Sequence, residues 1–323
     1  MTAESAAPVR VAEEARRSAI PDIAFRALTF GFALVVLLLL CGVLATLIAG
    51  ALPALQTFGP AFVVTNVWNP VTEKFGALAP IYGTLVTSAI AMLIAIPVAF
   101  GIALFITELC PVWLKRPLGT MIELLAAIPS IIYGIWGLFV LAPFVQEYVE
   151  PALINTIGEV PGIGLLFAGP PLGIGVLTAG FILAVMVLPL IASIMRDMFE
   201  TVPPMLKESA YALGATTTEI AWQVVLPYTR VGVAGGILLG LGRALGETMA
   251  VTFVIGNSHH INLSILQPGT TISAALANEF TEAVGDLYLS SLIALGLILF
   301  LITLVVLAIA RLLMSRLQQQ AGS

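Results

Sequence analysis

The sequence predicts an all-α membrane protein with six transmembrane helices. The first observation is composition: 59% of the 323 residues are hydrophobic and only 10% are charged, whereas soluble domains carry about 25% charged residues. The second is that the hydrophobic residues gather in six runs, each long enough to cross a hydrocarbon core of about 30 Å as a helix. The third is that these runs are continuous and do not alternate with polar residues, which excludes the strands of a membrane β-barrel. Helices are expected because the bilayer offers no water to unpaired backbone groups.

The six expected spans cover Leu28 to Gly50, Pro80 to Thr107, Gly119 to Phe144, Gly173 to Met195, Val231 to Gly256 and Leu287 to Ala310. The segments outside them, 1–27 and 311–323, are expected to be tails, the first of them flexible. Arg16 and Arg17 before an apolar run would also fit a secretory signal peptide, but this run has 23 residues and signal peptides have about 7 to 15. We therefore interpret it as an uncleaved first span. The Gly- and Pro-rich segment 151–171 is expected as a surface loop, with a partly re-entrant segment as the alternative.

The positively charged residues predict the orientation of the spans. Eleven of the 13 Lys and Arg residues lie before the first span, after the sixth, or in the loops that follow the second and fourth spans. The other two are Lys74, in a loop on the opposite side, and Arg243, inside the fifth span. Because basic residues gather on the cytoplasmic side of membrane proteins, both termini are expected to be cytoplasmic.

Motifs of common enzyme classes are missing from the sequence. No lysine stands in the Gly-Lys-Ser/Thr context of a phosphate-binding loop, and no serine is flanked as Gly-x-Ser-x-Gly. The only histidines are the adjacent His259 and His260, which excludes a His-Glu-x-x-His zinc motif and is typical of a polar loop. The sequence therefore predicts no catalytic residue, no metal site, no ATPase activity of its own and no nucleic-acid partner.

The cytoplasmic loop between the fourth and fifth spans has the signals of two short helices. Pro203-Pro204 is typical of a helix start, and Gly214 falls where a helix terminator is expected. Thr216 and Glu219 then form a Thr-x-x-Glu capping box that opens a second helix, expected to run to Pro227. The loop 203–227 is therefore predicted to dock on another surface, and the alternative is an amphipathic helix among lipid headgroups.

Arg243 and Glu247 lie near the middle of the fifth span. A charge at this depth costs roughly 2.5–3.5 kcal/mol on insertion scales, so a site that faces protein or water is the default expectation. Glu247 lies one helical turn after Arg243 and is expected on the same face. The planar guanidinium suits bidentate contact with a tetrahedral oxyanion, and Glu247 would offset its charge. The alternative is a structural pair of mutually neutralised charges.

The expected external loops are acidic. Their single lysine, Lys74, is outnumbered by Glu73, Glu147, Glu150, Glu159, Glu279, Glu282 and Asp286. A free anion approaching this side would be repelled. Delivery of the anion by a carrier protein would remove that difficulty.

The spacing in the cytoplasmic loop resembles the EAA loop of ABC-importer permeases. It reads Glu208-Ser209-Ala210, three residues, Gly214, nine residues, and Val224-x-Leu226-Pro227, with Ser209 and Val224 as the two departures. The resemblance implies a type I permease fold in which this loop is the coupling helix that enters a cleft of a cytosolic ATPase. The coupling residues that it implies are Glu208, Ser209, Ala210, Gly214, Leu226 and Pro227.

Three further segments resemble the permeases of phosphate importers of the Pst type. They are Arg243 to Ala250, Glu123 to Gly134, and Gly169-Pro170-Pro171. The resemblance is to the PstC-type subunit more than to PstA, and it implies that Arg243 and Glu247 line the substrate path. For Glu123 an interfacial carboxylate without a pore role is the alternative.

The same resemblance implies the assembly and its location. The partners would be a PstA-type permease, a PstB-type ATPase dimer that holds ATP and Mg, and an external PstS-type phosphate-binding protein. The chain would need no cofactor of its own, and it would lie among the lipids of the bacterial inner membrane. The alternatives are a PstA-type subunit, a permease for sulfate or molybdate, an ion-coupled anion carrier, and a membrane sensor or assembly factor.

Overall fold

The computed structural model describes residues 7–158 and 160–319. Over these ranges the chain is built from helices and loops without a strand, and Asn69 and Lys74 form an isolated bridge. Six helical segments of the described chain are long and apolar enough to cross a membrane, which confirms the expected number. They are Ala24–Phe58, Leu78–Leu109, Ser130–Thr156, Val176–Glu200, Thr217–Gly246 and Asp286–Leu312.

The chain divides into two compact units, 1–50 and 51–323. Helix α1 (Ala7–Phe58, 52 residues) provides all the described structure of the first unit. It is helical from Ala7 onward, so most of the expected flexible tail 1–27 is helical, in keeping with the helix-forming Ala, Glu and Arg residues in it. Residues 1–6 lie outside the described chain.

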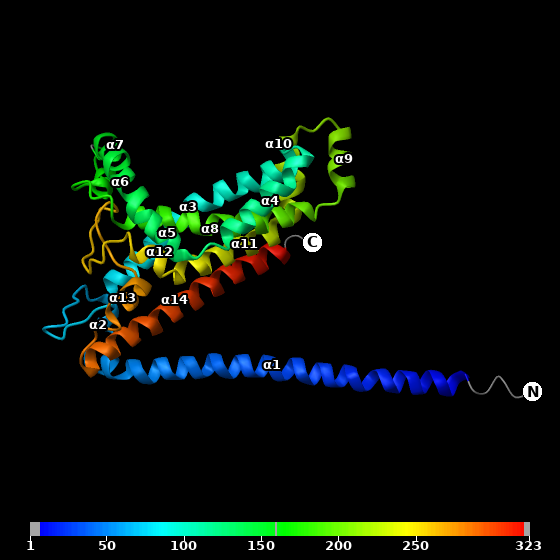
Figure 1. The fold of residues 1–323 in the computed structure, drawn as a ribbon, viewed down its shortest axis with the longest axis horizontal. Helices are drawn as coiled ribbons and strands as arrows, with labels where there is room; N and C mark the ends of the chain where they lie inside the picture. The colour runs from blue at the N-terminus through cyan, green and yellow to red at the C-terminus, as the bar shows by residue number, and fades with distance from the viewer. Residues whose placement is uncertain (1–6, 159, 320–323) are drawn as a thin grey trace, which may run out of the picture. The chain divides into compact units, whose positions relative to one another are not determined.

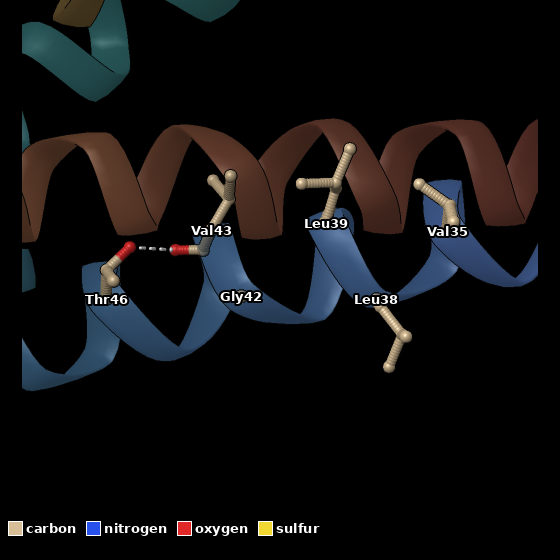
Figure 2. A pocket seen from close by; sticks show the side chains of 6 residues that line it. All are labelled: Val35, Leu38, Leu39, Gly42, Val43 and Thr46. Atoms are coloured by element: carbon tan, nitrogen blue, oxygen red, sulfur yellow. Dashed lines mark hydrogen bonds between the residues drawn. The ribbon is translucent and has the colours of Figure 1, made fainter.

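An apolar groove lies on the part of α1 that belongs to the first unit, as Figure 2 shows. Gly42 has no side chain to fill the groove, and the other lining side chains are aliphatic except for that of Thr46. The Thr46 hydroxyl donates a hydrogen bond to the carbonyl oxygen of Val43 at 2.8 Å. This bond satisfies the one polar side chain of the groove within the helix itself.

The second unit contains the remaining elements. They are α2 (Ala61–Val64), α3 (Leu78–Leu104), η1 (Phe105–Leu109), α4 (Val112–Ala126), α5 (Ser130–Trp136), η2 (Gly137–Leu141), α6 (Ala142–Phe144), η3 (Val145–Val149), α7 (Glu150–Thr156), η4 (Ile163–Phe167), α8 (Val176–Glu200), α9 (Pro204–Ala212), α10 (Thr217–Ile220), η5 (Ala221–Val225), α11 (Leu226–Gly246), α12 (Met249–Thr252), α13 (Ile272–Glu279) and α14 (Asp286–Gln319). Because α14 continues to Gln319, most of the expected tail 311–323 is also helical.

The core of the second unit is the packing of α3 and α11 against α8. In α3 four fully buried alanines repeat at every fourth position: Ala91, Ala95, Ala99 and Ala103. A Cβ added to Gly180 of α8 would lie 2.6 Å from Ile90 Cγ2, and one added to Gly240 of α11 would lie 2.6 Å from Ile191 Cδ1. Small residues therefore let these helices approach closely, as membrane helices need in the absence of a hydrophobic driving force.

The expected third span, 119–144, is wrong in its bounds. Helix α4 ends at Ala126, and the chain leaves helical geometry at Pro129, which is extended (φ −57°, ψ 135°) and precedes a new helix. Proline has no N–H and disfavours helical geometry in the residue before it, here Ile128. The spanning segment is Ser130–Thr156, and it passes through two π-helical turns, η2 and η3. Helix α4 is a separate element that packs on α8.

The two ends of the second unit carry different elements (Figure 1). Helices α9, α10 and α4 and the end of α14 lie toward one end, and α2, α6, α7 and α13 lie toward the other. The segment 151–171, expected as a surface loop or a partly re-entrant segment, contains the remainder of α7 and the 3₁₀ helix η4.

Candidate translocation site and coupling loop

Arg243 lies in the last turn of α11, where its positive charge complements the negative end of the helix dipole. Its side chain is exposed on the surface of this chain, as are those of Leu239 and Met249. Within the described part of the chain no hydrogen bond or ion pair holds the guanidinium. None of its five N–H donors therefore has a partner among the residues that the structure describes.

Glu247 does not continue the helix that carries Arg243, so the expectation of one shared helix face is wrong. The helix ends at Gly246, and Glu247 is extended (φ −69°, ψ 132°). Its Oε1 accepts a hydrogen bond from the backbone N–H of Ala250 at 3.3 Å, at the start of α12. The carboxylate thereby satisfies one of the N–H groups that α12 leaves unpaired, and this competes with continuation of α11.

The break after α11 lies against the third span. A Cβ added to Gly134 of α5 would lie 2.9 Å from the carbonyl oxygen of Met249 and 3.1 Å from Ala250 Cα. The neighbouring Tyr133 is buried and donates its hydroxyl hydrogen to the carbonyl oxygen of Leu125 at 2.8 Å. The structure thus brings together two segments that stood apart in the sequence motifs, the start of α5 and the break between α11 and α12.

Glu123 has a partner of its own. Its Oε1 pairs with Arg196 Nη2 of α8 at 2.7 Å, and Asp197 accepts from the same nitrogen at 2.7 Å. A Cβ on Gly119 would lie 2.4 Å from Arg196 Nη1, so the bare backbone of α4 makes room for the guanidinium. Glu123 therefore joins α4 to α8, and no contact links it to Arg243 in the described chain.

The cytoplasmic loop has the two helices and the capping signals expected of it. Helix α9 begins at Pro204, and Gly214 follows its end with φ +89°, a conformation that favours glycine. Thr216 and Glu219 form the complete capping box of α10, with Thr216 N to Glu219 Oε2 at 2.8 Å and Glu219 N to Thr216 Oγ1 at 3.3 Å. The expected end at Pro227 is wrong: the helix passes through the π turn η5 into α11. The proline comes just after the π turn, inside this continuous helical segment.

The coupling residues implied by the resemblance lie on this loop. Helix α9 has no buried residue, and Glu208 and Ser209 are exposed. The Ser209 hydroxyl donates back to the carbonyl oxygen of Met205 at 2.7 Å, whereas Ala210 packs on the core. Leu226 also packs against the core at the start of α11, and Pro227 is exposed.

The sequence carries no signal for a cluster of side chains around Glu279, a residue that lies outside the spanning segments. Its carboxylate accepts from Trp68 Nε1 at 2.6 Å and from the Tyr288 hydroxyl at 2.7 Å, and it pairs with His259 Nε2 at 2.6 Å. Trp68 and His259 also stack, with ring centroids 5.0 Å apart. Burial alone would raise the pKa of Glu279, but the hydrogen bonds and the charge of His259 hold it below its ordinary value. His259, expected only as part of a polar loop, is thus a structural partner.

Known structures share this fold. The chain matches a solved bacterial alginate ABC transporter, in complex with a periplasmic protein bound to an alginate pentasaccharide, with TM-score 0.58 at 19% identity, covering 90% of this chain and 94% of the other. The fold is that of ABC-importer permeases.

Relatives of similar length define the family. Residues 95–319 match the family described as binding-protein-dependent transport system inner membrane component, and the chain belongs to this family. It is 62% identical over 308 residues to the phosphate transport system permease protein PstC of Mesorhizobium japonicum, covering 95% of this chain and 94% of the relative. It is 57% identical over 303 residues to the protein of the same name from Pasteurella multocida, with 94% of each covered.

Proposed function

We propose that this chain is the PstC-type permease subunit of an ATP-driven phosphate importer in the bacterial inner membrane. The observation that carries the proposal is the exposed guanidinium of Arg243, which lies in an apolar span and has no ion pair among residues 7–158 and 160–319. Such a charge must face water or another subunit, because lipid would leave it unsolvated. The names of the relatives, which match over almost the whole chain, support phosphate as the substrate.

In this proposal Arg243 binds the anion as it passes. The guanidinium offers parallel N–H donors to two oxygens of a tetrahedral oxyanion, and it stays charged at every working pH. Glu247, at the break just beyond, lowers the net positive charge so that the anion can leave again. We leave Glu123 outside the path because Arg196 holds its carboxylate.

The path would be completed by a second permease of the PstA type, which covers the exposed face of α11. Helix α9 would dock on one subunit of a PstB-type ATPase dimer, which binds ATP and Mg. The exposed apolar residues of the loop, Met205 (75% exposed) and Leu213 (90%), are suited to that contact. This places α9 and both termini in the cytoplasm, and α13 on the side that receives phosphate from a PstS-type binding protein.

Labelled-phosphate uptake by the complete complex in proteoliposomes tests this function. Uptake is expected to require both ATP in the compartment that holds the ATPase and the binding protein in the other compartment. Excess unlabelled phosphate should abolish the uptake of labelled phosphate, and sulfate or molybdate at the same concentration should leave it unchanged. Uptake that persists without the ATPase would indicate an ion-coupled carrier. Stronger inhibition of uptake by sulfate or molybdate than by phosphate would indicate that another oxyanion is the substrate. Either result would contradict the proposal.

A further inference from the structure

Helix α9 is held to the membrane spans by one ion pair that the sequence motifs do not contain. Lys207 Nζ lies 2.6 Å from Glu108 Oε1, and the two side chains are only 19% and 8% exposed. Other side-chain hydrogen bonds of the described α9 stay within the loop: Ser209 bonds Met205, and Tyr211 bonds Thr217. The pair is therefore the one charged link between this helix and a spanning segment of the described chain.

The carboxylate stands on a firmly held turn. Glu108 lies in η1, the π-helical turn that ends the span of α3, and π turns inside helices often occur at functional sites. Thr107 of the same turn is buried, and its hydroxyl donates to the carbonyl oxygen of Ala103 at 3.0 Å. Lys115 Nζ donates to the carbonyl oxygen of Thr107 at 2.5 Å. These hydrogen bonds fix the turn that carries Glu108 to the end of α3.

The π turn η5, which follows α10 in the loop 203–227, also touches α3. Trp222 of η5 packs on Phe100 of α3 with ring centroids 5.4 Å apart, and Phe100 meets Phe199 of α8 edge to face at 5.7 Å. Helix α9 therefore contacts η1, the turn that follows α3, and η5 contacts α3 itself.

The far end of α3 contacts the segment that leads into α13. The backbone N–H of Ile272 donates to Thr84 Oγ1 at 3.0 Å. A Cβ added to Gly83 would lie 1.9 Å from the carbonyl oxygen of Thr270, so the two backbones touch directly. With 27 residues α3 is about 40 Å long, and it connects the coupling loop with the opposite end of the unit.

We propose that the Glu108–Lys207 pair is a positioning element that transfers the movement of α9 to α3. It deepens the proposed function and rests on it. A short, charge-assisted hydrogen bond between two mostly buried groups resists separation, whereas the exposed remainder of α9 could slide over the bundle. Movement imposed on α9 by the ATPase then displaces α3, and α3 displaces the segment 270–272.

The test uses the complete complex in proteoliposomes and measures ATP hydrolysis and phosphate uptake on the same preparation. The main variant, Glu108→Gln with Lys207→Met, removes both charges together and keeps the side-chain volumes. Both are replaced because removal of a whole buried ion pair costs little stability, whereas removal of one partner leaves a buried charge unpaired. A second variant, Glu108→Lys with Lys207→Glu, exchanges the charges. Arg116→Met is the control, since Arg116 is an exposed base on the neighbouring α4 without an ion pair in the described structure.

The neutral double variant is expected to keep ATP hydrolysis within about twofold and to lose at least fivefold in phosphate imported per ATP. The exchange variant should recover at least half of the original ratio, and Arg116→Met should leave it unchanged. A neutral variant with the original ratio would overturn the inference, and so would an exchange variant without recovery. If the unaltered complex hydrolyses ATP but imports no phosphate, the proposed function itself fails, which separates the two results.

Discussion

Replacing Gly134 by alanine should disturb the candidate site through packing alone. The added Cβ would lie 2.8 Å from Phe253 Cδ2, 2.9 Å from the carbonyl oxygen of Met249 and 3.1 Å from Ala250 Cα. Since non-bonded carbon atoms prefer about 3.5–4.0 Å, α5 and α12 must separate by roughly 0.5–1 Å. The Phe253 ring can turn aside, but the other two contacts are with backbone atoms and are relieved only by a change in the position of α12 relative to α5.

Overpacking of this kind costs about 1–3 kcal/mol. Because α12 begins two residues after Glu247, the same shift would displace that carboxylate. Gly134→Ala is therefore expected to lower the free energy of unfolding of the detergent-solubilised chain by this amount, and to lower uptake by the complex. Denaturant titration and the uptake assay measure the two effects.

Gly101→Ala is the matched control. Gly101 lies within α3, and an added Cβ there meets no atom within 4 Å. Alanine in a helix is favoured over glycine by about 0.5–1 kcal/mol, so this variant should be as stable as the original chain or more stable. The packing argument would be refuted if Gly134→Ala matched Gly101→Ala in both stability and uptake.

Two further predictions concern the loops at the two ends of the unit. Glu279→Gln should lose about 2–4 kcal/mol of stability because charge-assisted hydrogen bonds are lost, whereas the exposed Glu282→Gln should change little. Since the pKa of Glu279 is held below its ordinary value, the ionised carboxylate stabilises the fold above pH 4.5, and this stabilisation is lost as the pH falls through the folded pKa. Unfolding of Glu279→Gln and Glu282→Gln is measured as a function of pH. A Glu279→Gln chain that loses stability in acid as the original chain does would contradict this prediction. At Gly214, φ +89° makes alanine unfavourable by about 1 kcal/mol or more, and Gly214→Ala should weaken co-purification of the ATPase, while equal recovery would argue against the role of this turn.

Prolines show why the spans could be counted from the sequence but not bounded. Pro97 lies inside α3 and Pro189 inside α8 without ending either helix, whereas Pro129 separates α4 from α5. In a membrane, neighbouring helices can satisfy the carbonyl groups that a proline leaves free. Whether a proline breaks a helix therefore depends on tertiary neighbours that a single sequence does not display.

The sequence singles out the residues of the candidate site but not their geometry. Arg243 stands out because a charge is conspicuous in an apolar run. The break at Glu247 was not, since the sequence carries no proline there and the carboxylate competes with the helix through a local hydrogen bond to Ala250. The Glu108–Lys207 pair joins residues 99 positions apart, and no local pattern could reveal it.

Phosphate uptake by the complete complex carrying Arg243→Gln, compared with Arg230→Gln in the first turns of the same helix, tests the role of Arg243. We expect that Arg243→Gln abolishes uptake while the complex still assembles and hydrolyses ATP, and that Arg230→Gln transports normally. Uptake by Arg243→Gln at the level of the unaltered complex would contradict the claim that this guanidinium lies on the path of the anion.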